Sequence, residues 1–299
     1  MSVPTETCEV IFEHYTHAMR WMVGHGIQLR LGRTSHYERI IRHWNDVYKS
    51  ASADEGRQIV PDFVSSMFEI FDFVSLHNAF KGLQSAQLTP IIAKLQKGVS
   101  GPINAADETP SSTAARNFLF EAVVAAKAHR PGRGANTIFD ARSDTGIRLN
   151  GKKIWVEYKR VTTVERIESN VRKASSQLET ILAGKVGSGH RGIVALDVSK
   201  ILDRGDKIFV TRNDDELMSS VDRMMDQFIA EHSHIWQRVY ERRHKKIIGT
   251  IIRFAFMANS EDRSLLVHAS QWAMNPRLGV AASDDQLQRQ LVATLATSP

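Results

Sequence analysis

The dipeptide Asn150-Gly151 lies between two runs of alternating apolar and polar residues, GIRL and KKIWVEYKR. It is the strongest short signal of a two-residue β-hairpin, because both residues tolerate the positive φ angles of a type I′ turn. A two-residue loop pairs Leu149 with Lys152, so the numbers of all facing residues add up to 301. The turn therefore predicts which side chains share a face of the sheet.

This register brings two carboxylates together. Asp144 faces Glu157, and facing residues of an antiparallel pair point to the same side with Cβ atoms about 5 Å apart. The two acids repel each other, so a cation is expected between them: Lys159 shares the face, and carboxylate oxygens suit Mg²⁺. Asp140 is the alternative acid, but it faces Val161, roughly 13 Å from the level of Asp144. A solvated strand edge is the other interpretation of Glu157 and Lys159.

The residues around the hairpin predict an α/β core. Strand, helix and strand over residues 154–198 form a βαβ unit, which favours a right-handed crossover and a partly parallel sheet. The alternation and spacing of apolar residues predict helices over 113–129, 164–183 and 215–246, strands over 137–142, 146–151, 152–160, 192–200, 247–260 and 264–274, and a short polar helix near the end.

Residues 1–100 are predicted to form an all-helical region, because apolar residues recur at spacings of three and four. Pro61 fits the first turn of the third helix. The stretch 97–112 is rich in Gly, Pro, Ser and Asp and is the best candidate for a linker. We expect a helical region over 1–100 and a core over 111–299.

Composition limits the class of protein. Hydrophobic residues make up 42% of the chain and charged residues 24%, which suits a packed core. The apolar runs are too short to span a bilayer. Cys8 is the only cysteine, which excludes an internal disulfide and a cysteine-rich zinc site. These features lead us to expect a cytoplasmic protein with no membrane partner.

Basic residues concentrate around the hairpin. From Arg130 to Lys173 there are 11 Lys and Arg against 5 Asp and Glu, an excess as large as the net charge of +6 of the whole chain. Such a surface attracts polyanions, above all nucleic acid. A solvated lysine-rich surface is the alternative.

Two further basic features are ambiguous. Near the end of the predicted helix over 215–246 there are five basic residues, Arg238, Arg242, Arg243, Lys245 and Lys246. They could complement the helix dipole or contact a nucleic-acid backbone. The stretch GKVGSGH, residues 184–190, resembles a phosphate-binding loop in composition. It lacks the spacing of a Walker A motif, so we interpret it as a flexible loop.

The helix before the hairpin contributes another acid. Ala114, Phe118, Glu121, Ala125 and Ala128 follow one helical stripe, in which Glu121 is the only charge. A carboxylate on an apolar stripe either lies at the edge of the buried face or has a partner. Glu121 is therefore either peripheral or a group near the same cation.

The order of these features resembles the PD-(D/E)XK nuclease superfamily, whose fold is shared by many restriction and DNA-repair nucleases. The similarity covers about residues 111–200, with a helix carrying Glu121, a strand carrying Asp144, a hairpin, and a strand carrying Glu157 and Lys159. It implies a restriction-endonuclease-like core, a mixed central sheet flanked by helices, here preceded by an all-helical region.

The resemblance also implies roles for these residues. Asp144 and Glu157 would bind Mg²⁺, for which Mn²⁺ can substitute, and Glu121 would complete the metal site. Lys159 would position the attacking water and stabilise the transition state. Some branches add a glutamine on the next helix, for which Gln177 is the candidate.

Two positions depart from the pattern of the superfamily. The exonuclease branches that use this glutamine often carry a tyrosine four residues later, where this chain has Ile181. That difference argues against those branches. The proline of the motif is also absent, because Ser143 precedes Asp144; this position varies widely in the superfamily.

The implied function is metal-dependent hydrolysis of nucleic-acid phosphodiester bonds, in DNA rather than RNA, and a role in restriction or phage defence is compatible. One alternative is a nuclease-like fold that binds nucleic acid or a protein without hydrolysis. Another is an interaction protein whose helical region assembles homo-oligomers. The retained acids and Lys159 favour the enzyme.

Overall fold

A computed structural model describes residues 7–29, 32–47, 52–130, 132, 134–138, 146–203, 208–261 and 265–297. The helices are α1 (Cys8–Gly24), α2 (Arg33–Val47), α3 (Ala53–Phe80), α4 (Ser85–Gly98), α5 (Ala114–Ala128), α6 (Ile167–Ala183), α7 (Ser199–Asp203), α8 (Asp214–Glu241) and α9 (Ala282–Ala296), with short 3-10 turns η1 (Ala105–Asp107) and η3 (Val164–Arg166). The strands are β1 (Ala135–Ile138), β2 (Gly146–Leu149), β3 (Lys152–Arg160), β4 (His190–Asp197), β5 (Ile208–Thr211), β6 (Ile247–Ser260) and β7 (Leu265–Pro276).

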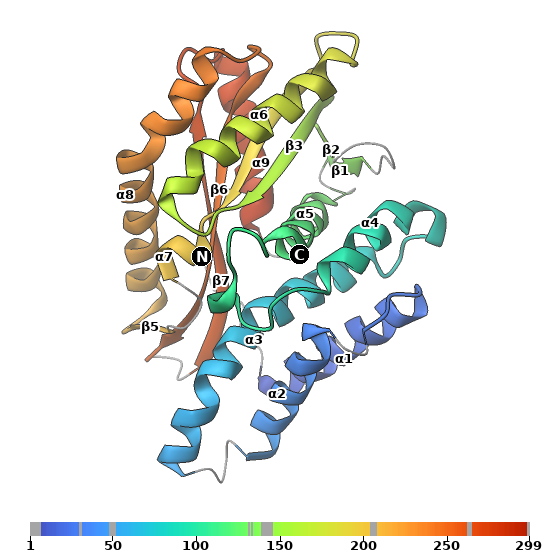
Figure 1. The fold of residues 1–299 in the computed structure, drawn as a ribbon, viewed down its shortest axis with the longest axis vertical. Helices are drawn as coiled ribbons and strands as arrows, with labels where there is room; N and C mark the ends of the chain where they lie inside the picture. The colour runs from blue at the N-terminus through green and yellow to red at the C-terminus, as the bar shows by residue number, and fades with distance from the viewer. Residues whose placement is uncertain are drawn as a thin grey trace.

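The described strands form one mixed seven-stranded sheet (Figure 1). Its order is β1-β2-β3-β4-β6-β5, with β7 also paired to β6. The pairs β3–β4, β4–β6 and β5–β6 are parallel. The pairs β1–β2, β2–β3 and β6–β7 are antiparallel. A mixed sheet was predicted, but β5 was not among the six predicted strands. The parallel pairing of β3 with β4 across α6 confirms the predicted βαβ unit.

The hairpin has the predicted register. Leu149 pairs with Lys152 and Ile147 with Ile154, and both turn residues have positive φ angles, 48° at Asn150 and 75° at Gly151. The last described pair joins Gly146 to Trp155. Asp140, Ser143 and Asp144 lie outside the described residues, so the predicted facing of Asp144 and Glu157 stays a prediction.

Two layers of helices enclose the sheet. α6 and α8 cover one face, where their apolar side chains join those of Trp155, Val194 and Phe254. α5 and α9 cover the other face (Figure 1), where the Phe120 ring meets the Tyr158 ring edge-on at 5.7 Å. Successive β3 side chains therefore alternate between the α6 side and the α5 side.

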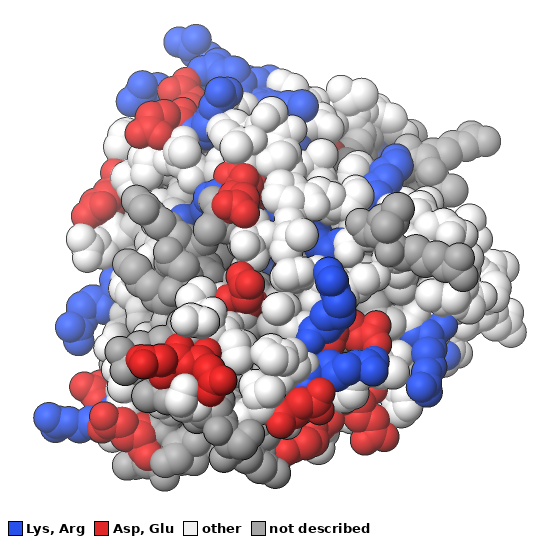
Figure 2. Space-filling model, turned by 60° about the horizontal axis from the view of Figure 1, so that its bottom comes forward, with Lys and Arg blue, Asp and Glu red and all other residues white. Residues whose placement is uncertain are grey.

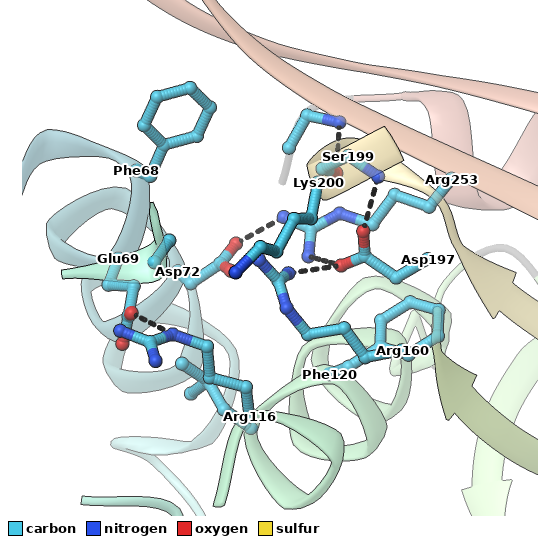
Figure 3. A pocket seen from close by; sticks show the side chains of 13 residues that line it. Phe68, Glu69, Asp72, Arg116, Phe120, Arg160, Asp197, Ser199, Lys200 and Arg253 are labelled. Carbon is cyan, nitrogen blue, oxygen red and sulfur yellow. Dashed lines mark hydrogen bonds and ion pairs between the residues drawn. The ribbon is translucent and has the colours of Figure 1, made fainter. Parts of the chain in front are cut away.

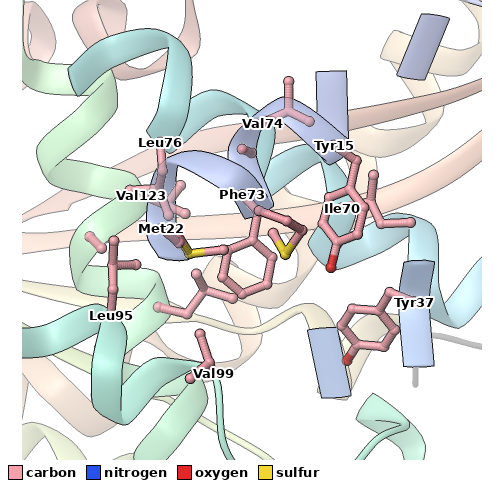
Figure 4. Close-up of a cluster of buried hydrophobic side chains, with 14 of the residues drawn as sticks. Tyr15, Met22, Tyr37, Ile70, Phe73, Val74, Leu76, Leu95, Val99 and Val123 are labelled. Carbon is pink, nitrogen blue, oxygen red and sulfur yellow. The ribbon is translucent and has the colours of Figure 1, made fainter. Parts of the chain in front are cut away.

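The N-terminal helices α1–α4 pack against α5 and extend the hydrophobic core. Figure 4 shows Phe73 of α3 and Leu95 of α4 in the same cluster as Val123 of α5. The helical nature of this region is confirmed for the residues that the structure describes, but the start predicted for the third helix is wrong. Ser52 and Glu55 form a capping box, so α3 begins at Ala53 and Pro61 lies inside it.

The stretch 97–112 is held by side chains from both neighbouring regions. Arg33 donates hydrogen bonds to the Gly98 and Ser100 carbonyls at 2.6 and 2.9 Å. Arg116 of α5 donates to the Pro102 carbonyl at 2.9 Å. The candidate linker is therefore bound at several points. Across the described ranges, no helix is both long and apolar enough to cross a membrane.

Candidate functional site

Three of the side chains singled out in the sequence meet on the α6 side of β3. The Lys159 ammonium donates to Gln177 Oε1 at 3.0 Å and lies 3.3 Å from Glu157 Oε2. Glu157 is only 3% exposed, and the Lys159 side chain is 11% exposed. The structure thus brings together Glu157, Lys159 and Gln177, although Lys159 and Gln177 are 18 positions apart in the sequence.

Alternation along β3 and the spacing of α6 explain this meeting. Glu157 and Lys159 have the same parity as Trp155, whose ring packs in the cluster under α6. In α6, Ala174 and Leu178 are buried against the sheet. Gln177 follows Ala174 by three residues, so it lies at the edge of that buried face, within reach of Lys159.

Glu121 is buried, 5% exposed, and forms an ion pair with Lys94 of α4. The ion pair gives this carboxylate a partner on the apolar stripe, and the role of Glu121 at a metal site stays a prediction. Because α5 covers the face opposite α6, Glu121 approaches from the other layer. The described hydrogen bonds join Glu121 to the helical region and Glu157 to the group formed with Lys159 and Gln177.

The described donors suit a hard cation but do not form a complete cage. In the parts of the chain that the structure describes, no three or more His, Cys, Asp or Glu side chains cluster in a way that could hold a metal ion. Mg²⁺ usually takes only one or two carboxylates and completes its shell with water and substrate oxygens. The buried carboxylate of Glu157 fits this pattern, with Asp144 as the expected second ligand.

An open hollow of about 650 Å³ lies along α6, and Gln177 is the member of the Glu157, Lys159 and Gln177 group that lines it. It gives the Gln177 end of the group access to solvent. Its lining is polar and carries both signs of charge, from Glu165, Glu168, Ser169, Arg172, Lys173, Ser176 and Gln177.

The basic excess between Arg130 and Lys173 is not all on the surface. Lys159 points into the group described above, and Arg160 is bound to Glu108 and Asp197. On the face in Figure 2, basic side chains gather along the upper edge, whereas acidic and basic groups mix over the lower half. The charge is therefore local and does not form one continuous basic surface on that face.

A second cluster of charges, which the sequence did not reveal, lies at the carboxyl ends of β3 and β4 (Figure 3). Asp197 accepts from Arg160 at 3.1 Å and from Arg253 at 3.4 Å, and the Ser199 amide donates to its other oxygen at 3.0 Å. Burial alone would raise the pKa of Asp197, but the two guanidinium groups and Ser199 hold that pKa below its usual value.

The same cluster extends into the helical region. Arg253 donates to Asp72 of α3 at 2.6 Å, and Arg116 of α5 donates to Glu69 of α3 at 2.6 Å. Burial raises the pKa of Asp72, and Arg253 offsets only part of that effect. The cavity between these groups measures about 30 Å³, room for one or two waters at most. We therefore assign the cluster a structural role.

Replacing Arg253 with alanine is expected to lower the free energy of unfolding by about 3–5 kcal/mol, because it leaves the buried Asp72 carboxylate without its partner. Urea unfolding measures the change. A double variant, Arg253→Met with Asp72→Leu, should recover most of the loss. The exposed pair of Arg42 and Glu38 is the control, since Arg42→Ala should cost under about 1 kcal/mol. Equal losses for both arginines would contradict the assignment.

Lys127 of α5 lies near this cluster. Burial and the charge of Arg253 lower its pKa from 10.5 to about 8. Between pH 8 and 10.5 the unfolded chain binds this proton more tightly than the folded chain, so the free energy of unfolding rises with pH across that window.

Lys127→Met is therefore expected to stabilise the protein at pH 7 by about 1–3 kcal/mol, with the difference from wild type disappearing by about pH 10.5. Thermal unfolding at pH 7 and 10 measures both effects. The exposed Lys81→Met is the control and should change neither. A destabilised variant, or a pH-independent difference, would contradict the burial argument.

Compared with models of known protein families, with curated proteins and with solved structures, the chain matches none of them.

Proposed function

We propose that the protein is a metal-dependent nuclease that hydrolyses phosphodiester bonds of nucleic acid, DNA rather than RNA. A role in restriction or phage defence is compatible with this activity. The observation that carries this proposal is the contact of Lys159 with both Glu157 and Gln177, of which Gln177 lines an open hollow along α6. A buried carboxylate beside an ammonium group is suited to a divalent cation and a phosphate together.

The order of elements supports the same proposal. From α5 to β4 the chain forms a helix, three strands, a helix and a strand, namely α5, β1, β2, β3, α6 and β4. The resemblance to PD-(D/E)XK nucleases was based on this order. The antiparallel hairpin and the parallel β3–β4 pair agree with a restriction-endonuclease-like core.

Each side chain of the group has a part in the proposed reaction. Water attacks phosphorus, the bond to the leaving oxygen breaks, and that oxygen takes up a proton. A bound Mg²⁺, held by Glu157 and Asp144, would supply a nucleophilic water at neutral pH and neutralise phosphoryl charge. Lys159 places a positive charge where negative charge develops, and Gln177 holds that ammonium in position.

The test is incubation of plasmid, linear duplex DNA, single-stranded DNA and RNA with the protein in Mg²⁺, Mn²⁺ or EDTA. Cutting is expected with either metal and not in EDTA, with DNA preferred. Cutting in EDTA would contradict the metal dependence. Binding to nucleic acid without cutting in either metal would contradict the enzyme and favour the non-hydrolytic alternative.

A further inference from the structure

The loop 184–190 joins α6 to β4 and is tied to two neighbouring elements. The Lys246 ammonium, just before β6, donates to the Gly187 carbonyl at 3.2 Å. The Lys153 amide, near the start of β3, donates to the Gly189 carbonyl at 2.9 Å. The loop therefore gathers basic residues at the amino ends of β3, β4 and β6, away from Lys159 near the carboxyl end of β3.

An aromatic pair lies under these basic side chains. The Trp155 indole donates to His190 Nδ1 at 3.0 Å, and the two rings are parallel within 5°. The Lys185 ammonium lies 4.5 Å from the centre of the Trp155 ring, a cation–π contact that fixes its position. Burial and the charges of Lys153, Lys185 and Lys246 lower the pKa of His190, so all three ammonium groups lie near enough to act on its imidazole.

Within the described part of the chain, these three ammonium groups have no acidic partner. No ion pair joins Lys153, Lys185 or Lys246 to a carboxylate among the residues with described positions. The neighbouring acids Asp284 and Glu179 are already bound, to Arg191 and Arg243 respectively, each at 2.7 Å. Three half-buried ammonium groups without an acidic partner among the described residues suit a polyanion with repeated phosphates.

We propose that Lys153, Lys185 and Lys246 bind backbone phosphates of a nucleic acid and so anchor the substrate away from the site of cleavage. Lys153 and Lys159 share one face of β3 and are six residues apart, roughly 20 Å. That span corresponds to about six nucleotides at 3.4 Å each along one strand of a duplex. The link between anchoring and cleavage rests on the proposed function; the binding itself does not.

The test is binding of a fluorescent 20-base-pair DNA duplex in EDTA, followed by anisotropy between 50 and 200 mM salt. The test variant combines Lys153→Gln, Lys185→Gln and Lys246→Gln. The control variant combines Arg20→Gln, Lys81→Gln and Arg223→Gln, which are exposed side chains on other elements. Both variants lose three positive charges, so they differ only in where the charge is lost.

Three lost phosphate contacts should reduce the salt slope by about 2.7. When salt rises fourfold, the affinity of the control should therefore fall by a factor about 40 times larger than the factor for the test variant. At 50 mM salt the test variant should already bind more weakly than the control. Circular dichroism melting of both variants verifies that each is folded. Equal slopes for the two variants would overturn the proposal.

Two more outcomes separate the possibilities. If the test variant loses binding to phosphatidylserine vesicles but keeps the duplex, the surface is for membranes and the proposal is overturned. Cleavage is measured separately in Mg²⁺. If the salt slope of binding depends on the three lysines but no DNA is cut, the anchoring surface is supported and the nuclease proposal fails. If DNA is cut but both variants have equal salt slopes, the nuclease proposal is supported and the anchoring surface fails.

Discussion

A chain shortened to residues 111–299 is expected not to fold by itself. Leu119, Val123 and Met257 are each at most 3% exposed and pack in the cluster that α1–α4 complete. Exposing each of them costs about 1.5–3 kcal/mol, against a total stability of about 5–15 kcal/mol for a typical domain. Arg116 and Arg253 would also lose Glu69 and Asp72, their partners on α3.

Urea unfolding followed by circular dichroism tests this prediction, and the shortened chain should show no cooperative unfolding transition. Co-expression with residues 1–110 as a separate chain is the control, and it should restore both the transition and a stable complex. Cooperative unfolding of residues 111–299 alone, near the urea midpoint of the full chain, would contradict the prediction. The core over 111–299 would then be an independent folding unit.

Features set by neighbouring residues could be predicted from the sequence. The Asn150-Gly151 turn fixes its own register through local φ angles, and the β3–α6–β4 crossover follows from the succession of patterns along the chain. The contact of Lys159 with Gln177 depends on only these two features, because the crossover lays α6 over the face that carries Lys159. This is why part of the site could be anticipated.

The buried ion cluster could not be predicted, because its contacts join distant parts of the chain. Asp72 and Arg253 are 181 residues apart, and Asp72 lies in an amphipathic helical pattern in which an acid is ordinary. Arg253 did carry a signal, since it is the lone charge in the apolar run IIRFAFMA. Such a residue needs a buried partner, but the sequence pattern does not identify which acid supplies it.

Two segments differ from prediction for different reasons. The capping box at Ser52 starts α3 eight residues before Pro61; its Ser-x-x-Glu pattern is local, so the sequence did carry this signal. The terminal helix looked short and polar, yet α9 buries Leu287, Leu291 and Leu295 against the sheet. Their spacing of four residues marks a narrow apolar stripe, and α5, β6 and β7 give that stripe its partners.

Glu157→Gln is expected to abolish metal-dependent cleavage, and Lys159→Ala to reduce it by about 10²–10³-fold, the usual cost of removing one group that stabilises transition-state charge. Gln177→Ala should reduce it less, by about tenfold, because Gln177 acts through the Lys159 ammonium. Initial rates on the substrate that the cleavage panel identifies measure all three, with the exposed Lys81→Ala as the charge-matched control.

Binding in EDTA separates a catalytic effect from a lost interface. Glu157→Gln removes a buried negative charge, so duplex binding without metal should stay equal to wild type or become tighter, while cutting disappears. Lys159→Ala removes one positive charge and should weaken binding far less than it slows cutting. If both losses were equal, Lys159 would act in substrate binding alone. If cutting survived both substitutions, the reaction would occur elsewhere, and the register derived from Asn150-Gly151 would mark only a structural ion pair.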